Sequence, residues 1–209
     1  GYNKFAIESF LDEIALARQM DPLALRMELC VNSSRMLLVL EELARLCEWD
    51  RVREGTALGI SVAAYGETMA AGVAEVSLDQ SNGVISVHNF WTVVDPGLVI
   101  APDNSRAQME GAIIFGLSHV LKERITIKDG EVQQSNYHDY PILRMSEIPA
   151  VQVKLLSTDN PPSGIGETGV PLTGAAVANA LAALTGLRLR HLPLTPRRVL
   201  AALDANEPS

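Results

Sequence analysis

Cysteine is scarce in this sequence of 209 residues, with Cys30 and Cys47 its only two. They do not form a C-x-x-C pair, and no second pair exists to complete a four-cysteine site. The chain alone therefore cannot build a structural zinc site or an iron–sulfur cluster. We expect both residues to be buried free thiols.

Positive charge is also in deficit, because 17 Lys and Arg residues face 25 Asp and Glu residues, a net charge of -8. No basic run occurs, and binding to nucleic acid or to an anionic membrane needs clustered cations, so no nucleic-acid partner is expected. No apolar run reaches the roughly 18 residues of a membrane span, so no direct span is expected either. With 47% hydrophobic and 20% charged residues, the composition is typical of a globular protein.

Motifs for several common chemistries are missing. The four histidines are scattered without an i, i+4 pair, which argues against a metal held by histidine; they are His88, His119, His138 and His191. The sequence contains no P-loop and no nucleophile elbow. We expect no metal ion held by side chains.

The first fifty residues show helical periodicity. After a predicted cap at Asn3, an apolar face is formed by Ile7, Phe10, Leu11, Ile14 and Ala17, and the other faces carry Glu8, Asp12 and Glu13. Asp21 and Pro22 predict the start of a second helix, and a third is expected after residues 32–34. Residues 1–50 are therefore predicted to be a helical segment.

Residues 51–209 mix strands and helices. Alternating apolar residues predict strands near 58–64, 73–78, 84–94 and 151–156, with turns at Asn82-Gly83 and Asp129-Gly130. A helix over 105–124, capped by Asp103 or Asn104, is expected to be the central buried helix. Another, over 172–184, should end at Gly186. The predicted fold is α+β: an N-terminal helical cap, a mostly antiparallel or mixed sheet, and packed helices.

A glycine- and proline-rich stretch, residues 160–171 (NPPSGIGETGVP) and called the glycine loop below, separates the last strand from the last long helix. Its three glycines let the backbone approach another body around the single carboxylate of Glu167. The run 164–169 matches G-x-G-x-x-G, but residues 159–163 separate it from the strand and no acidic residue answers about 20 positions later. The simpler alternative is a turn with a solvated glutamate.

Gln108 stands near the start of the helix predicted over 105–124. At helical spacing it shares one stripe with Gly111, Ala112 and Phe115, a small-residue surface that a backbone or a flat ligand could approach. Alternatively, it is a glutamine near a helix start that bonds water or a loop carbonyl. The polar and aromatic stretch 136–141 is expected to be a loop beside a site.

Taken together and in order, short motifs along nearly the whole chain resemble the C-terminal part of the molybdenum-binding subunit of the xanthine dehydrogenase/aldehyde oxidase family. Within it, the resemblance is to the branch of the isoquinoline 1-oxidoreductase large (beta) subunit. The motifs are FAIESFLDE (5–13), DPL (21–23), VAEV (73–76), VD (94–95), QMEG (108–111), QSN (134–136), DYP (139–141), GIGE (164–167) and AVANA (176–180).

The resemblance implies molybdenum hydroxylase chemistry on an N-heterocycle or an aldehyde, with a molybdopterin cofactor in its cytosine dinucleotide form. It implies that Glu167 is the general base, whose basicity partial burial would raise. Gln108 would bond near the molybdenum, and the backbone of Gly164, Ile165 and Gly166 would line the same pocket. Residues 51–209 would be a portion of the molybdenum-cofactor-binding domain.

The same resemblance implies partners. These are the remainder of the molybdenum subunit, from which this chain is expected to be an excised or processed portion, and a small iron–sulfur subunit carrying [2Fe-2S] clusters. Pro96 and Thr168 depart from the cysteine and the proline that many relatives carry, and the glycine-rich segments that hold most of the cofactor are absent. We therefore expect the 209 residues alone to bind no molybdopterin tightly and to catalyse nothing. A non-catalytic scaffold for subunit association is the alternative.

Overall fold

Three helices come first, as the sequence predicts, and strands and further helices follow them. The computed structural model describes residues 1–206. Its elements are α1 (Tyr2–Ala17), α2 (Pro22–Leu29), α3 (Ser34–Leu46), β1 (Ala57–Tyr65), β2 (Thr68–Asp79), β3 (Val84–Asp95), α4 (Pro102–Leu121), β4 (Ile127–Lys128), β5 (Glu131–Val132), the 3-10 helix η1 (Met145–Glu147), β6 (Ala150–Leu155), α5 (Val170–Thr185) and α6 (Pro196–Asn206). The α+β class is confirmed. Within residues 1–206, no helix is both long and apolar enough to cross a membrane.

Four strands form the main sheet in the order β1-β2-β3-β6. Neighbours are antiparallel from β1 to β3, whereas β6 runs parallel to β3, so the sheet is mixed. The turns predicted at Asn82-Gly83 and Asp129-Gly130 are confirmed, and both glycines have positive φ. A parallel return needs a long crossover, and here it contains α4. The crossover brings the end of β6, and the glycine loop beyond it, beside the end of β3.

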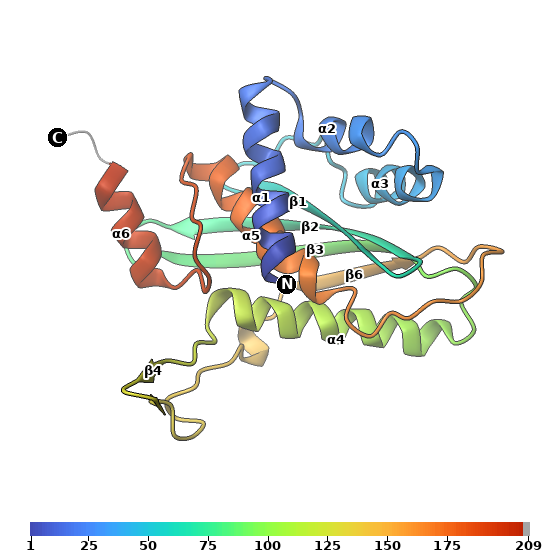
Figure 1. The fold of residues 1–209 in the computed structure, drawn as a ribbon. Helices are drawn as coiled ribbons and strands as arrows, with labels where there is room; N and C mark the ends of the chain where they lie inside the picture. Colours follow the sequence, from blue (N-terminus) through green and yellow to red (C-terminus); the bar gives the residue numbers. More distant parts are fainter. Residues whose placement is uncertain (207–209) are drawn as a thin grey trace.

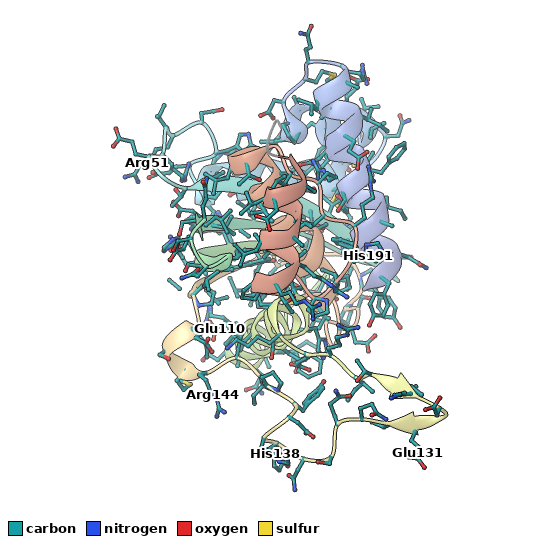
Figure 2. All side chains as sticks on the ribbon, turned by 90° about the vertical axis from the view of Figure 1, so that its left-hand side faces the viewer. Arg51, Glu110, Glu131, His138, Arg144 and His191 are labelled. Carbon is teal, nitrogen blue, oxygen red and sulfur yellow. The ribbon has the colours of Figure 1, made fainter. Side chains whose placement is uncertain are left out.

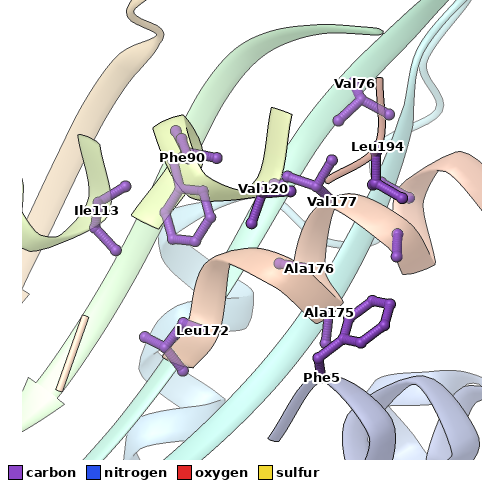
Figure 3. Packing of buried hydrophobic residues seen from close by; sticks show 14 of the residues in the cluster. Phe5, Val76, Phe90, Ile113, Val120, Leu172, Ala175, Ala176, Val177 and Leu194 are labelled. Carbon is purple, nitrogen blue, oxygen red and sulfur yellow. The ribbon is translucent and has the colours of Figure 1, made fainter. Parts of the chain in front are cut away.

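Helices cover both faces of this sheet (Figure 1). Side chains that point to one face pack against α4 and α5, and those that point to the other pack against α3; examples are Ala70, Ala74, Phe90 and Val94 on the first face and Ala71, Val73, Trp91 and Val93 on the second. The alternation follows the two-residue repeat of a strand. Figure 3 shows the first of these cores, with Phe90, Ile113, Val120 and Leu172 brought together from β3, α4 and α5.

Helix α5 is the central buried helix. All of its residues from Leu172 to Leu181 are buried, and it lies almost directly on the backbone of β1. A Cβ added to Gly59 in β1 would lie 2.1 Å from the backbone nitrogen of Ala180, which no side chain tolerates. The alanines of α5 and the glycine of β1 therefore permit this close approach.

The expectation that the helix over 105–124 would be the central one is wrong. Helix α4 begins three residues earlier, at Pro102, with neither Asp103 nor Asn104 as its cap. It packs on the outer side of α5 and leaves Gln108, Gly111 and Phe115 exposed. An apolar composition alone did not reveal that one stripe of the helix carries no core contacts.

The predicted apolar face of α1 is also wrong. Ile7 and Phe10 are 52% and 57% exposed, whereas Glu8 and Asp12 are buried. The predicted Asn3 cap is wrong as well, because Gly1 precedes the first helical residue. The reason for the inverted face is a buried cation on α2, described next.

Arg26, with Glu8 and Asp12, forms what we call the Arg26 cluster. The Arg26 Nε lies 2.9 Å from Glu8 Oε2, and its Nη1 lies 2.7 Å from Asp12 Oδ1. Burial raises the pKa of Asp12, although the Arg26 charge lowers it. The Glu8 carboxylate also accepts the backbone N–H of Val62 on the edge strand β1, at 3.1 Å. The charges thus tie α1, α2 and the sheet edge together.

The proposed boundary between residues 1–50 and 51–209 stays a prediction. Helix α3 packs on β2 and β3, and the Lys154 ammonium of β6 bonds the Glu42 carboxylate of α3. The last three residues of the second segment, 207–209, lie outside the described part of the chain.

Candidate functional site

The glycine loop is held by its backbone along most of its length. The N–H of Leu98 donates to the Asn160 carbonyl at 2.9 Å, and the Ser163 N–H donates to the Pro96 carbonyl at 2.8 Å. Further along, the Thr68 hydroxyl donates to the Gly164 carbonyl at 2.9 Å. Three residues of the loop's first half, Asn160, Ser163 and Gly164, are therefore fixed against the ends of β2 and β3.

Asp95 organises this junction. Its side chain is fully buried and accepts Arg35 Nε at 2.7 Å, Gly97 N at 2.9 Å and Thr158 Oγ1 at 3.2 Å. Burial acts to raise the pKa of Asp95, but the bonds from Arg35 and Gly97 outweigh it and hold the pKa below its usual value. The carboxylate thus fixes the end of β3 and the start of the segment that leads to the glycine loop.

Gly97 could not be another residue here. Its φ is +82°, and a Cβ would lie 2.2 Å from the carbonyl oxygen of Pro161 in the glycine loop. Both the left-handed conformation and the contact require glycine. The turn that contains Pro96 and Gly97 is therefore tightly packed, and the Pro96 carbonyl accepts a hydrogen bond from Ser163 of the loop.

Gln108 meets the other end of the glycine loop. Its Nε2 donates to the Gly166 carbonyl at 2.9 Å, one peptide before Glu167. This is the loop-carbonyl bond that the simpler interpretation of Gln108 anticipated. It uses one of the four hydrogen-bonding positions of the amide, so the remaining ones can still serve a ligand.

Gln108 and Glu167 share one cavity of about 610 Å³, called the Glu167 cavity below. It is lined by Gly1, Gln108, Gly111, Ala112, Phe115, His119, Gly166, Glu167, Val170 and Pro171. The structure thus brings together three of the five predicted site residues, Gln108, Gly166 and Glu167. Gly164 and Ile165 are not among the lining residues, and the Ile165 side chain packs on the main core.

The glycines around this cavity differ from those of the core. A Cβ on Gly111, Gly164 or Gly166 would meet nothing within 4 Å, so the folding of the described chain does not demand glycine there. By contrast, a Cβ on Gly169 would lie 2.9 Å from Ala112 Cβ. The open glycines leave bare backbone facing outward beside Gln108 and Glu167.

Glu167 itself is exposed, so this part of the chain does not supply the partial burial expected for it. The next residue, Thr168, is 1% exposed, and its Oγ1 has no hydrogen-bond partner among residues 1–206. A buried hydroxyl without a partner costs stability. The Thr168 side chain therefore makes no hydrogen bond within residues 1–206.

A second cavity of about 560 Å³ adjoins the first and shares Gly1, His119, Val170 and Pro171 with it. His119 Nε2 lies 3.1 Å from Glu123 Oε2, and the Tyr140 hydroxyl donates to the same oxygen at 2.6 Å. This bond raises the pKa of Tyr140 to about 12. The predicted loop 136–141 thus reaches a cavity wall through Tyr140. The i, i+4 pair of His119 and Glu123 was not predicted from the sequence.

Among residues 1–206, no group of three or more His, Cys, Asp or Glu side chains lies close enough together to hold a metal ion. Cys47 is buried, which raises its pKa to about 12, and Cys30 is half-buried rather than buried as expected.

A match to a known protein family shows the family to which this chain belongs. The molybdopterin cofactor-binding domain matches residues 41–149, more than half of the chain. The chain belongs to the molybdopterin cofactor-binding domain family. The matched residues include Gln108 and end before Glu167.

Individual relatives of this molybdopterin cofactor-binding domain agree. The chain is 40% identical over 210 residues to the isoquinoline 1-oxidoreductase subunit beta of Brevundimonas diminuta, across 99% of this chain and 27% of the relative. It is 33% identical to a membrane-bound aldehyde dehydrogenase of Gluconacetobacter polyoxogenes, across 98% and 29%, whose name specifies pyrroloquinoline quinone. The predicted resemblance is confirmed, and the chain spans less than a third of these relatives.

Among solved structures, the quinoline 2-oxidoreductase of Pseudomonas putida 86 is similar, with a TM-score of 0.62 and 26% identity. The similarity covers 68% of this chain and 19% of that one. The molybdopterin cofactor-binding domain described here therefore shares its fold with part of a much longer oxidoreductase.

Proposed function

We propose that this chain is part of a molybdopterin-dependent oxidoreductase that hydroxylates an N-heterocycle or an aldehyde with oxygen derived from water, and that Glu167 is its general base. One observation carries the proposal: Glu167 and Gln108, far apart in sequence, meet at one cavity, where Gln108 Nε2 bonds the carbonyl beside Glu167 at 2.9 Å. The family match and the names of the relatives supply the reaction class.

The residues at the Glu167 cavity fit a molybdopterin. Gly111 and Gly166 present backbone where a Cβ would meet nothing, so a flat group can lie close to α4 and to the glycine loop. Gln108 keeps donor and acceptor positions for a polar ring edge. The metal would come with its pterin, because no described side-chain cluster could hold it.

Each residue has a defined part in this proposal. The bound cofactor would supply the electron acceptor and the activation of water. Glu167, on a backbone fixed at Gly164 and Gly166, removes the proton that is lost as oxygen attacks the substrate. Gln108 holds the Gly166 carbonyl and offers its remaining amide positions to the cofactor, and Gly164 and Ile165 set the course of the loop.

Two finer features belong to the proposal. The cofactor is the cytosine dinucleotide form, held mostly by the remainder of the molybdenum subunit. Electrons leave through [2Fe-2S] clusters on a small partner subunit, because such a cluster needs four ligands and this chain has two separate cysteines.

The test uses the full-length parent protein with its partner subunit and compares wild type with Glu167→Gln. Dye-linked oxidation of a panel of N-heterocycles and aldehydes is measured at matched molybdenum content. Loss of the base should lower kcat by about 10²- to 10⁴-fold. Glu131→Gln is the matched control, since Glu131 lies exposed at the end of the arm formed by residues 125–142 (Figure 2).

The contrary outcomes are distinct. Equal turnover by wild type and Glu167→Gln would remove the base assignment. A parent protein that contains neither molybdenum nor pyrroloquinoline quinone, and that turns over nothing, would favour the scaffold alternative. Pyrroloquinoline quinone in place of molybdenum would contradict the proposed cofactor.

A further inference from the structure

Thr68 is a buried residue that touches the glycine loop without lining the Glu167 cavity. It is the first residue of β2 and has no exposed surface. Its hydroxyl donates to the Gly164 carbonyl at 2.9 Å, across 96 positions of sequence. It is absent from the cavity's lining residues. Any effect of Thr68 on chemistry must therefore pass through the loop.

The turn that carries Thr68 lies against the loop at a second point. Tyr65 pairs with Thr68, so β1 and β2 are joined by the tight turn of Gly66 and Glu67. A Cβ on Gly66 would lie 3.7 Å from Ser163 Oγ, which is ordinary contact distance. Ser163 and Gly164 are thus both supported by the end of this hairpin.

Three consecutive residues of the loop are fixed by three different elements. Thr68 on β2 bonds the Gly164 carbonyl, the Ile165 side chain packs on the core, and Gln108 on α4 bonds the Gly166 carbonyl. Carbonyl and N–H of a trans peptide point in opposite directions. The two bonds therefore set the planes of the peptides that precede Ile165 and Glu167, and with them the direction in which the Glu167 side chain leaves the backbone.

We propose that Thr68 is a positioning residue for Glu167, which acts by fixing the Gly164 peptide of the glycine loop. The inference rests on the proposed function, since it gives Thr68 a role only if Glu167 is the base. Misplacement of a catalytic group by about 1 Å can cost on the order of 100-fold in rate. A single buried hydroxyl at the hairpin end is thus a determinant of turnover.

The test is a double-mutant cycle in the full-length parent with its partner subunit, at matched molybdenum content. Thr68→Val removes the donor and keeps the shape, and should lower kcat about 10- to 100-fold with little change in KM. In a Glu167→Gln background the same change should have no further effect, because no base remains to be positioned. Thr68→Ser should restore most of the activity.

The matched control is Thr92→Val. Thr92 is equally buried, and its hydroxyl donates to a backbone carbonyl, that of Ala71, at 3.0 Å. That carbonyl lies within the sheet rather than in the loop, so turnover should not change. If Thr68→Val does not accumulate as folded protein, Thr68→Cys, with its weak donor, takes its place.

A second readout is hydrogen exchange of residues 160–168 in the same proteins. Faster exchange is expected in Thr68→Val, and wild-type exchange in Thr68→Ser and Thr92→Val. Unchanged exchange overturns the inference, and so does an equal loss of kcat from Thr68→Val with and without Glu167. Failure of the proposed function is separately visible, because Glu167→Gln alone would then leave turnover intact, and the role of Thr68 would end with it.

Discussion

Two glutamates, Glu8 and Glu167, lie in opposite environments in two regions of this molecule. In the Arg26 cluster, Glu8 is buried, and its Oε2 accepts hydrogen bonds from the Arg26 guanidinium and from the backbone N–H of Val62 on β1. At the Glu167 cavity, the backbone before Glu167 is bonded at the Gly164 and Gly166 carbonyls, while the Glu167 side chain is exposed. The comparison teaches that a buried, ion-paired carboxylate holds the fold together, whereas an exposed carboxylate on a fixed backbone is available for chemistry.

The largest expected effect concerns the Arg26 cluster. Arg26→Ala would leave Glu8 and Asp12 buried without their cation, and should lower the free energy of unfolding by about 3–5 kcal/mol. Denaturant unfolding of the purified protein measures it. Arg18→Ala is the control, because the Arg18–Glu28 pair is about half exposed and should contribute less than about 1 kcal/mol. Equal losses of unfolding free energy in Arg26→Ala and Arg18→Ala would contradict the stabilising role of the Arg26 cluster.

Acidification separates two carboxylates of the fold. The pKa of Asp95 is lowered, so its contribution is complete above the unfolded-state value of about 4 and is lost as the pH falls through the lower folded-state pKa. The pKa of Asp12 is raised, so its contribution is present at low pH and is lost as the pH rises through the folded-state value.

Unfolding measured from pH 7 to pH 3 therefore distinguishes the two. Asp95→Asn should cost about 1.5–3 kcal/mol at pH 7 and should reduce the loss of stability on acidification. Asp12→Asn should steepen that loss, because it removes the group that opposes it. Parallel pH profiles for the two variants would contradict the assigned directions.

The two kinds of glycine should respond in opposite ways to alanine. Gly97→Ala places a side chain at φ +82° against the Pro161 carbonyl, and should destabilise by about 1–3 kcal/mol. Gly111→Ala lies on α4 in open space and should stabilise by up to about 1 kcal/mol. In the parent enzyme the same Gly111→Ala should reduce cofactor occupancy. Thermal unfolding and molybdenum content measure the two effects, and full occupancy would show that the open glycine is not used.

The smallest expected effect concerns the residue after Glu167. Thr168→Val keeps the shape and removes a buried hydroxyl that has no partner among residues 1–206, so it should be neutral or stabilising by about 1 kcal/mol. Turnover should not change. A loss of stability in denaturant unfolding would mean that the hydroxyl has a partner in the folded protein.

Much of the fold could be predicted because the periodic signals are local. The hairpin at Asn82-Gly83, the Asp21 cap and the helix end at Gly186 all depend on neighbouring residues. The apolar face of α1 could not be predicted, because Glu8 and Asp12 are buried by an arginine on another helix. A prediction from hydrophobic periodicity places every charged residue on the exposed face of a helix. Where a charged residue is paired with a buried opposite charge, as Glu8 and Asp12 are, the predicted and observed faces are reversed.

The candidate site shows the same division. Resemblance and residue type predicted Glu167 and Gln108, and the structure places them at one cavity, although their catalytic and binding roles stay predictions. Thr68, Arg35 and His119 were missed. Thr68 and Arg35 act on residues 96 and 60 positions away, which no spacing in the sequence reveals.

The contact between α5 and β1 limits how Glu167 can move. Helix α5 begins at Val170, three residues after Glu167, and a backbone-to-backbone approach at Gly59 leaves the helix no freedom to slide along the strand or to rotate. On the other side of Glu167, the loop is bonded at Asn160, Ser163, Gly164 and Gly166, so a displacement of the Glu167 backbone would have to break hydrogen bonds there. Glu167 is thus held between a bonded loop and a packed helix, and movement of its carboxylate would come from rotation of its own side chain.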